Sequence, residues 1–472
     1  MSGVIRGRHA LGLVCGVGLM MNGTAGCLSE RSFPMHAENS RRVSSEAGRA
    51  AAASTRAWLR AAHGELRDLL PASNPQVLLT EDLTGADGRP TDVFGHFGLR
   101  RESLRGLLGN LRGIQYTAQS ASREYCIDRP APSWPGFEDV WIPIKEDLSL
   151  NGRLGYARRG GVVCDSDCIV ILPGLFGDNG VQRTRDLALF LRDSGLHVLA
   201  LEMRGHGRTE AMYPNTYYTF GVGETDDLMI VSDWLEELPN VRRTGLMGFC
   251  WGANIALLAA WYDGRLPEDP GISSALRPHL NEPTGRRRFA AGVVACSPIL
   301  RWEVLLDDLD TSKSYFSNPV LAAIQDTVRD RMERKHHPEK SHSLRKLIAY
   351  EYEACNIPLP GGALEGYPFI RLMSYKNQPV GPKLENARMP VLIVHGGDDP
   401  IAPAQDVADF LSAIDNPLVA AVILPSGGHV GFAAYAPQYY FSLVASFFDP
   451  RVGAASGSPE LASAEVGDGS KH

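Results

Sequence analysis

From about residue 137 onward, short apolar runs alternate with amphipathic segments of helical length, and this alternation limits the folds open to the chain. Residues 168–172 form a continuous apolar run, as expected of a strand buried on both faces. Strands that alternate with helices predict a parallel sheet with right-handed crossovers. Strands are expected at 138–145, 152–157, 168–172, 197–201, 245–249, 291–295, 390–395 and 419–424, with a turn at Asn151-Gly152 and helices around 187–191, at 224–238, 253–262 and 439–448.

The regular alternation is interrupted once. Residues 299–388 are mostly helical in pattern, irregular and rich in charge, which indicates a helical lid inserted into the sheet domain. The core then comprises residues 137–298 and 389–450, and 472 residues are ample for one large core. Residues 451–472, rich in Gly, Ser, Ala and acids, are predicted to be a disordered tail. Residues 61–136 form an extension with no assigned role.

The N-terminal residues are typical of an export signal. Arg6 and Arg8 precede an apolar run, Ala10–Met21, that is too short to span a bilayer but suits a signal h-region. Thr24–Cys27 resembles the bacterial lipoprotein cleavage box, so residues 1–27 predict export, with Cys27 as the lipidated residue. Residues 28–60 would be a flexible tether on a membrane facing the periplasm or exterior. An ordinary cleaved signal and a cytoplasmic chain are the alternatives.

Charge and cysteine usage restrict the partners. The net charge of −7 is scattered over the chain, which argues against a nucleic-acid partner. Cys164 and Cys168 could form a disulfide in an oxidising compartment. With the aspartates between them they are a weak metal motif. No metal or organic cofactor is expected, and the sequence predicts no oligomeric state.

One pentapeptide carries the strongest indication of chemistry. Gly248-Phe249-Cys250-Trp251-Gly252 lies between a predicted strand and a predicted helix, and it has the pattern Gly-x-nucleophile-x-Gly. The nucleophile of such an elbow sits in a strained turn, and its glycine neighbours let the helix pass close to the strand. Cys250 is therefore the predicted nucleophile.

Two further candidate residues follow Cys250 in the chain order nucleophile, acid, histidine, which is the order expected after such an elbow. Asp399 comes after the strand at 390–395 and can orient a histidine, with Asp398 as the alternative. His429 follows the last strand and is flanked by glycines. The backbone N–H groups of Leu175 and Trp251 are the expected oxyanion donors.

Three motifs support a family resemblance. The runs Arg204–Gly207, Gly223–Leu228 and Gly427–Phe432 make residues 140–448 resemble the YheT-like, embryogenesis-associated branch of α/β hydrolases. The resemblance implies an α/β-hydrolase fold with a helical lid and serine esterase activity on short- to medium-chain acyl esters. Cys250 stands where those enzymes carry serine. Its pentapeptide is similar to that of dienelactone hydrolases, which use a Cys-His-Asp triad, and to that of polyhydroxyalkanoate synthases.

A cysteine nucleophile narrows the expected substrates. A thiol beside an imidazole is readily held as a thiolate, but thiolate also leaves a tetrahedral intermediate more readily than alkoxide does. Thioesters, enol lactones and aryl esters are therefore favoured. The sequence predicts a carboxylesterase, lactonase or thioesterase that acts through a thioester acyl-enzyme. The alternatives are an acyltransferase or polyester synthase using the same triad, and a lipid-anchored binding protein without catalysis.

Overall fold

The structure is a computed structural model of the chain. It describes residues 37, 40–44, 54–73, 76–121, 133–265, 284–311, 319–357 and 383–449. The predicted export signal at 1–27, Cys27, most of the predicted tether at 28–60 and the predicted tail at 451–472 lie outside the described residues.

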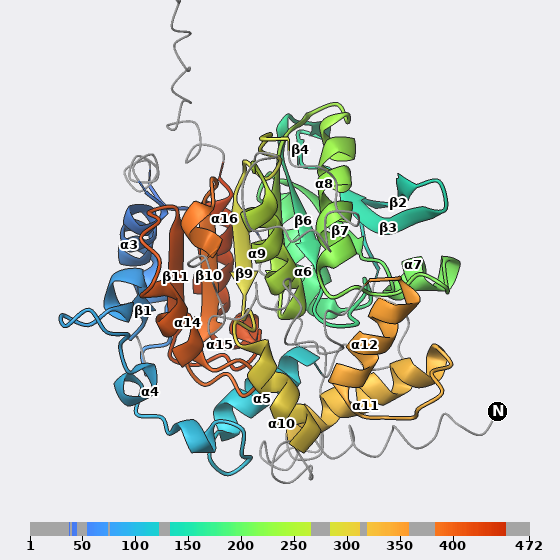
Figure 1. The fold of residues 1–472 in the computed structure, drawn as a ribbon. Helices are drawn as coiled ribbons and strands as arrows, with labels where there is room; N and C mark the ends of the chain where they lie inside the picture. The colour runs from blue at the N-terminus through green and yellow to red at the C-terminus, as the bar shows by residue number, and fades with distance from the viewer. Residues whose placement is uncertain are drawn as a thin grey trace, which may run out of the picture.

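A mixed sheet forms the centre of the molecule (Figure 1). Its central strands run parallel, as the alternating sequence pattern predicts, and β3 and β2 continue it antiparallel at one edge. Within the described residues the order is β1-β11-β10-β9-β8-β6-β7-β3-β2. These strands are β1 (Leu78–Leu79), β2 (Phe137–Lys145), β3 (Leu148–Gly155), β6 (Ser166–Leu172), β7 (His197–Glu202), β8 (Val241–Phe249), β9 (Val293–Cys296), β10 (Val391–Gly396) and β11 (Val419–Leu424); β4 (Arg158–Arg159) and β5 (Val162–Val163) form a separate ribbon.

Helices cover both faces of the sheet, because each central strand sends alternate side chains to opposite sides. In β6, Cys168, Val170 and Leu172 pack into one apolar cluster, whereas Ile169 and Ile171 pack into the other. The first cluster includes α8 (Val222–Glu236), α9 (Trp251–Tyr262) and α14 (Ala404–Leu411), and the second includes α3 (Thr55–Leu66), α6 (Gln182–Asp193) and α16 (Pro437–Phe447).

Residues 54–73 and 76–121, which precede the predicted core, belong to the folded domain. Helix α3 starts at Thr55, inside the segment predicted as a tether, and buries Trp58 and Leu59 against α16. Strand β1 adds antiparallel to β11 at the sheet edge. The prediction of a tether to residue 60 is therefore wrong at its C-terminal end, because the apolar face of α3 completes the core on that side.

The first hairpin differs from the sequence prediction. The turn lies between β2 and β3 at residues 146–147, and Asn151 and Gly152 lie inside β3. Asn151 is buried, and its amide donates to Asp139 and to the carbonyl of Val140 on the neighbouring strand. A Cβ at Gly152 would lie 2.6 Å from the Leu199 side chain, so Gly152 provides space for close strand packing and not a turn.

The interruption of the sheet pattern contains helices, as the sequence predicts. These are α10 (Trp302–Thr311), α11 (Pro319–Arg334) and α12 (Leu344–Ala354), followed by the 3₁₀ turn η9 (Lys383–Asn386). The three helices pack on one another, and α11 also contacts α5 (Leu111–Ala121). Figure 1 shows this group at one end of the sheet. The remaining elements are α4 (Val93–His96), α7 (Gly207–Met212) and α15 (Phe432–Tyr435), with η2 (Arg67–Leu69), η3 (Thr80–Leu83) and η4 (Arg101–Ser103).

The described cysteines are free thiols. Cys168 lies in the interior of β6, and Cys164 donates to the carbonyl of Ala157, so the possible Cys164–Cys168 disulfide is not formed. No group of three or more His, Cys, Asp or Glu in the described ranges could hold a metal ion. None of the helices in the described part of the chain is both long and apolar enough to cross a membrane.

Candidate active site

Cys250 occupies a sharp turn between β8 and α9. Its φ of 54° and ψ of −119° lie in a region that L-residues rarely adopt. The backbone N–H of Cys250 donates to the carbonyl of Cys296 (2.9 Å), while its own carbonyl accepts from Ala253 (3.0 Å) at the start of α9. Hydrogen bonds on both sides of the turn therefore hold the strained conformation, and the thiol is left partly exposed.

The two glycines of the pentapeptide make this turn sterically possible. A Cβ at Gly248 would lie 2.1 Å from the carbonyl oxygen of Gly252. A Cβ at Gly252 would lie 2.2 Å from the carbonyl oxygen of Pro173, in the loop after β6. Helix α9 thus passes too close to β8 and to the neighbouring loop for any side chain at either position.

Asp399 and His429 form a buried pair. Oδ2 of Asp399 lies 2.8 Å from Nδ1 of His429, and both side chains are buried. Oδ1 of Asp399 accepts hydrogen bonds from the N–H groups of Ile401 (2.8 Å) and Ala402 (2.9 Å). Because a carboxylate only accepts, Nδ1 of His429 carries the proton and Nε2 faces away from Asp399.

The charges of this site favour an ionised imidazole. Burial opposes the charge on His429, but Asp399 and Cys250 together raise the pKa of His429 to about 10. Cys250 raises this pKa both by electrostatic attraction and through a side-chain hydrogen bond with the imidazole. Burial also opposes the charge on Asp399, yet His429 and the N–H donors keep the pKa of that carboxyl below its usual range.

Asp398, the alternative acid, has a different set of contacts. Its carboxylate accepts from the Ser426 hydroxyl and from the N–H of Gly428 (2.8 Å). Burial raises the pKa of Asp398 to about 6, although these two donors favour its charged form. Asp398 therefore ties the end of β10 to the loop that carries His429, whereas Asp399 contacts the imidazole itself.

Helix α5 positions the histidine loop, a role that sequence reasoning missed. Thr117 accepts from the backbone N–H of His429 (2.8 Å) and donates to the carbonyl of Gly113 (2.6 Å). Gly428 has φ of 53°, and a Cβ there would lie 2.1 Å from the Gly113 carbonyl oxygen. The glycines around His429 thus allow α5 to pack against this loop. No motif in residues 61–136 indicates that contact.

The loop after β6 lies against the elbow. A Cβ at Gly174 would lie 3.3 Å from Cβ of Cys250 and 3.9 Å from its Sγ. Leu175 and Trp251, the predicted oxyanion donors, both line the cavity that contains Cys250. Neither N–H donates to an acceptor in the described part of the chain.

A cavity of about 140 Å³ joins these elements at the carboxyl ends of the parallel strands. Cys250 and His429 both line it. Helices α10, α11 and α12, which together form the insert in the sheet domain, contribute aliphatic side chains to the cavity wall. Among them are Leu305, Val320, Ala323, Ile324 and Leu344.

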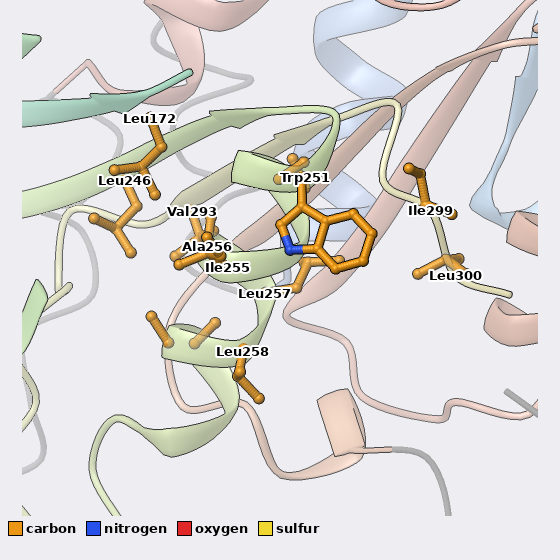
Figure 2. Packing of buried hydrophobic residues seen from close by; sticks show 14 of the residues in the cluster. Leu172, Leu246, Trp251, Ile255, Ala256, Leu257, Leu258, Val293, Ile299 and Leu300 are labelled. Carbon is orange, nitrogen blue, oxygen red and sulfur yellow. The ribbon is translucent and has the colours of Figure 1, made fainter. Parts of the chain in front are cut away.

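Trp251 lines this cavity and also belongs to the hydrophobic core. Figure 2 shows its indole at the start of α9, near the segment that carries Ile299 and Leu300. The ring also makes edge-to-face contacts with Phe220 and Trp302. The first helix of the insert is thereby packed directly onto the elbow.

Two of the motifs that carried the family resemblance form a buried polar network beside the site. Arg204 pairs with both carboxylate oxygens of Asp227. Glu224 caps the start of α8 by accepting from the N–H groups of Thr219 (2.8 Å) and Gly221 (2.7 Å). These residues fix the position of α8, and their contacts are with each other and not with Cys250 or His429.

Comparison with known proteins identifies the fold family. The family described as "Alpha/beta hydrolase family" matches residues 169–441. The embryogenesis-associated protein EMB8 of Picea glauca is 24% identical over 303 residues, which cover 62% of this chain and 59% of that protein. A probable 2-oxo-3-(5-oxofuran-2-ylidene)propanoate lactonase of a Bradyrhizobium species is 28% identical over 124 residues, or 24% of this chain and 49% of that protein. The chain thus covers less than two thirds of either relative.

Among solved structures, the esterase Pf2001 of Pyrococcus furiosus superposes with a TM-score of 0.41 at 17% identity, covering 68% of this chain and 96% of the esterase. The match of the family to more than half of the chain is the decisive comparison. It agrees with the parallel sheet, the helices on both of its faces and the elbow after β8. This chain belongs to the α/β hydrolase family.

Proposed function

We propose that this hydrolase cleaves acyl esters with Cys250 as nucleophile, His429 as general acid and base, and Asp399 as the group that orients the imidazole. One observation carries the proposal: the buried Asp399–His429 pair opens onto the same cavity as the strained Cys250 elbow. A nucleophile, a base and a group that orients the base, all at one cavity, are the arrangement that covalent acyl transfer requires.

The reaction follows from this arrangement. The Cys250 thiolate adds to the acyl carbonyl, and the carbonyl electron pair moves to oxygen, facing the N–H groups of Leu175 and Trp251. As the intermediate collapses, the bond to the leaving oxygen or sulfur breaks, and Nε2 of His429 gives that atom its proton. Water then attacks the thioester and transfers a proton to Nε2. The acid leaves, and the Cys250 thiolate is regenerated.

The substrate follows from the cavity and from sulfur chemistry. Ile324 and the other aliphatic side chains of the insert suit an apolar acyl group. Thiolate is a better leaving group than alkoxide, so the intermediate proceeds to product most readily when the substrate's own leaving group is good. Thioesters, aryl esters and enol lactones meet that condition, and the name of the Bradyrhizobium relative is that of a lactonase.

Substitution of Cys250 tests the nucleophile. Cys250→Ala should abolish hydrolysis of an aryl ester panel, and Cys250→Ser should retain weak activity. Mass spectrometry after brief exposure to an activated ester should find the acyl group on Cys250. Full activity of Cys250→Ala, or acylation only at other residues, would rule out the assignment.

A paired inhibitor experiment tests nucleophile and substrate class together. Iodoacetamide should block turnover of both an ester panel and a thioester panel. A fluorophosphonate should inhibit this enzyme less effectively than it inhibits a serine hydrolase. Absence of both burst acylation and turnover across the panels would favour a binding protein that has the site without catalysis.

Acyl transfer is a second candidate, favoured by the apolar wall that α10, α11 and α12 give the cavity. If these helices act as a lid that limits access of water to the thioester, an alcohol can capture the acyl group instead. Product analysis with added alcohols distinguishes the two reactions. Ester formation that exceeds acid formation in dilute alcohol identifies a transferase or polyester synthase.

We also propose that the chain is exported and anchored through a lipid on Cys27, on the strength of the sequence around it. Detection of an N-terminal lipidated Cys27 peptide in the membrane fraction tests this, with Cys27→Ala as the control. An unmodified peptide that begins at Met1 in the cytosolic fraction would contradict it.

A further inference from the structure

A buried arginine of the insert contacts the loop after β6. Arg331 lies near the end of α11, and its side chain is fully buried. Its guanidinium carbon lies 4.6 Å from the centre of the Phe176 ring. Phe176 follows Leu175 and has φ of 58°. A left-handed backbone is unfavourable for a bulky residue, so contacts around Phe176 must hold it in place.

His206 holds the same residue through the backbone. The N–H of Phe176 donates to Nε2 of His206 (3.1 Å), and Nδ1 of His206 lies 2.9 Å from the carbonyl oxygen of Arg204. A carbonyl only accepts, so Nδ1 carries the proton and Nε2 is the acceptor. Burial and the nearby charge of Arg331 lower the pKa of His206 to about 3. His206 is therefore neutral and remains an acceptor throughout the assay range.

Arg331 also ties the insert to the segment after β7. It pairs with Glu351 of α12 (Nε–Oε1 2.5 Å, Nη2–Oε2 2.9 Å) and donates from Nη1 to the carbonyl of Gly205 (2.8 Å). Glu351 in turn accepts from the N–H of Tyr218 (2.9 Å). The buried guanidinium of Arg331 thus connects α11 with α12, with the segment around Gly205 and with Phe176.

The helix that carries Arg331 also lines the cavity. Ala323, Ile324 and Thr327 of α11 face the space in front of Cys250. We propose that Arg331 and His206 are positioning residues that hold the Leu175 N–H in place to bind the oxyanion. An acyl group that contacts α11 thereby helps to hold Arg331 in place, and with it the N–H group that stabilises the oxyanion in the transition state. This inference rests on the proposed function.

The test compares two reactions of the same thiol. Acylation by an activated ester builds an oxyanion, whereas alkylation by iodoacetamide displaces iodide at a tetrahedral carbon and builds none. His206→Phe keeps a ring but cannot accept from Phe176. It should lower kcat for ester turnover about 10- to 100-fold, somewhat less than loss of a whole oxyanion donor. KM and the alkylation rate should stay within about 3-fold of wild type, and His206→Gln, which keeps an acceptor, should recover part of the loss.

Arg331 needs a paired substitution, because removal of the cation alone would leave the buried Glu351 unpaired. The double variant Arg331→Met/Glu351→Gln should show the same loss of kcat with alkylation retained. Glu333→Gln, on the exposed side of α11, is the matched control and should behave as wild type.

The possible outcomes distinguish failure of the positioning role from failure of the proposed function. Acylation at the wild-type rate in both His206→Phe and the double variant would overturn the positioning role. Equal loss of acylation and alkylation would also overturn it, because the thiol itself would then be affected. A wild-type chain that is alkylated at Cys250 but never acylated would overturn the proposed function, and the positioning role with it.

Discussion

Thr117 accepts a 2.8 Å hydrogen bond from the backbone N–H of His429, although 312 residues separate them in sequence. The threonine hydroxyl also donates to the carbonyl of Gly113 within α5. Helix α5 is therefore part of the site, because it sets the position of the backbone on which the imidazole stands.

Substitution of Thr117 tests this role. Thr117→Val preserves the shape of the side chain but leaves the buried N–H of His429 without its acceptor, at a cost of about 1–3 kcal/mol. We expect kcat for ester hydrolysis to fall about tenfold with KM little changed. Thr117→Ser, which keeps the hydroxyl, should remain close to wild type. Equal rates for the valine and serine variants would show that this hydrogen bond does not matter for turnover.

The two adjacent aspartates should respond differently to loss of charge. Asp399→Asn replaces the carboxylate beside Nδ1 of His429 with a neutral amide and should lower kcat about 10²- to 10⁴-fold, because the charge that stabilises the imidazolium is lost and the amide N–H favours the wrong imidazole tautomer. Asp398→Asn alters only the contacts to Ser426 and Gly428 and should cost less than about tenfold. Steady-state kinetics on purified, folded variants measure both. A larger loss in Asp398→Asn than in Asp399→Asn would reverse the assignment.

The charge on His429 should make stability depend on pH in the alkaline range. Its pKa is raised from 6.5 to about 10 in the folded protein, so protonated His429 contributes its full stabilisation below about pH 6.5. This contribution is lost as the pH rises through about 10. The difference in free energy of unfolding between wild type and His429→Gln should therefore shrink from pH 7 to pH 10, as measured by urea denaturation.

Cys250→Ala provides the matched control for that experiment. It removes one of the two side chains that raise the pKa of His429, so the alkaline loss of stability should begin at lower pH. A difference between wild type and His429→Gln that is constant over this range would contradict a charged imidazole in the folded state.

The sequence predicted the parallel sheet well because its strands are buried on both faces. The last strand, expected at 419–424, is observed as Val419–Leu424, and every residue in it is buried. The elbow around Cys250 was equally readable, since its glycines are required by contacts within a few residues and with the adjacent loop.

What the sequence did not predict depends on contacts between distant segments. Asn151-Gly152 has the composition of a turn, but pairing with β2 and the approach of Leu199 place it inside a strand. Thr117 and His206 act on backbone groups of loops far away in sequence, and no local pattern encodes such contacts.

The N-terminal segment offers a last test, because the sequence pattern suggested a tether up to residue 60. Trp58 is 1% exposed and packs edge-to-face on Phe447 of α16 at 5.3 Å. Trp58→Ala should lower the free energy of unfolding by about 3–5 kcal/mol, the usual cost of a large cavity. Trp58→Phe should cost much less, since the indole N–H has no partner within the described structure and its loss removes an unsatisfied donor. Arg60→Ala, at an exposed position of the same helix, is the control. If Trp58→Ala unfolds at the same urea concentration as Arg60→Ala, the packing of Trp58 against α16 does not contribute to stability.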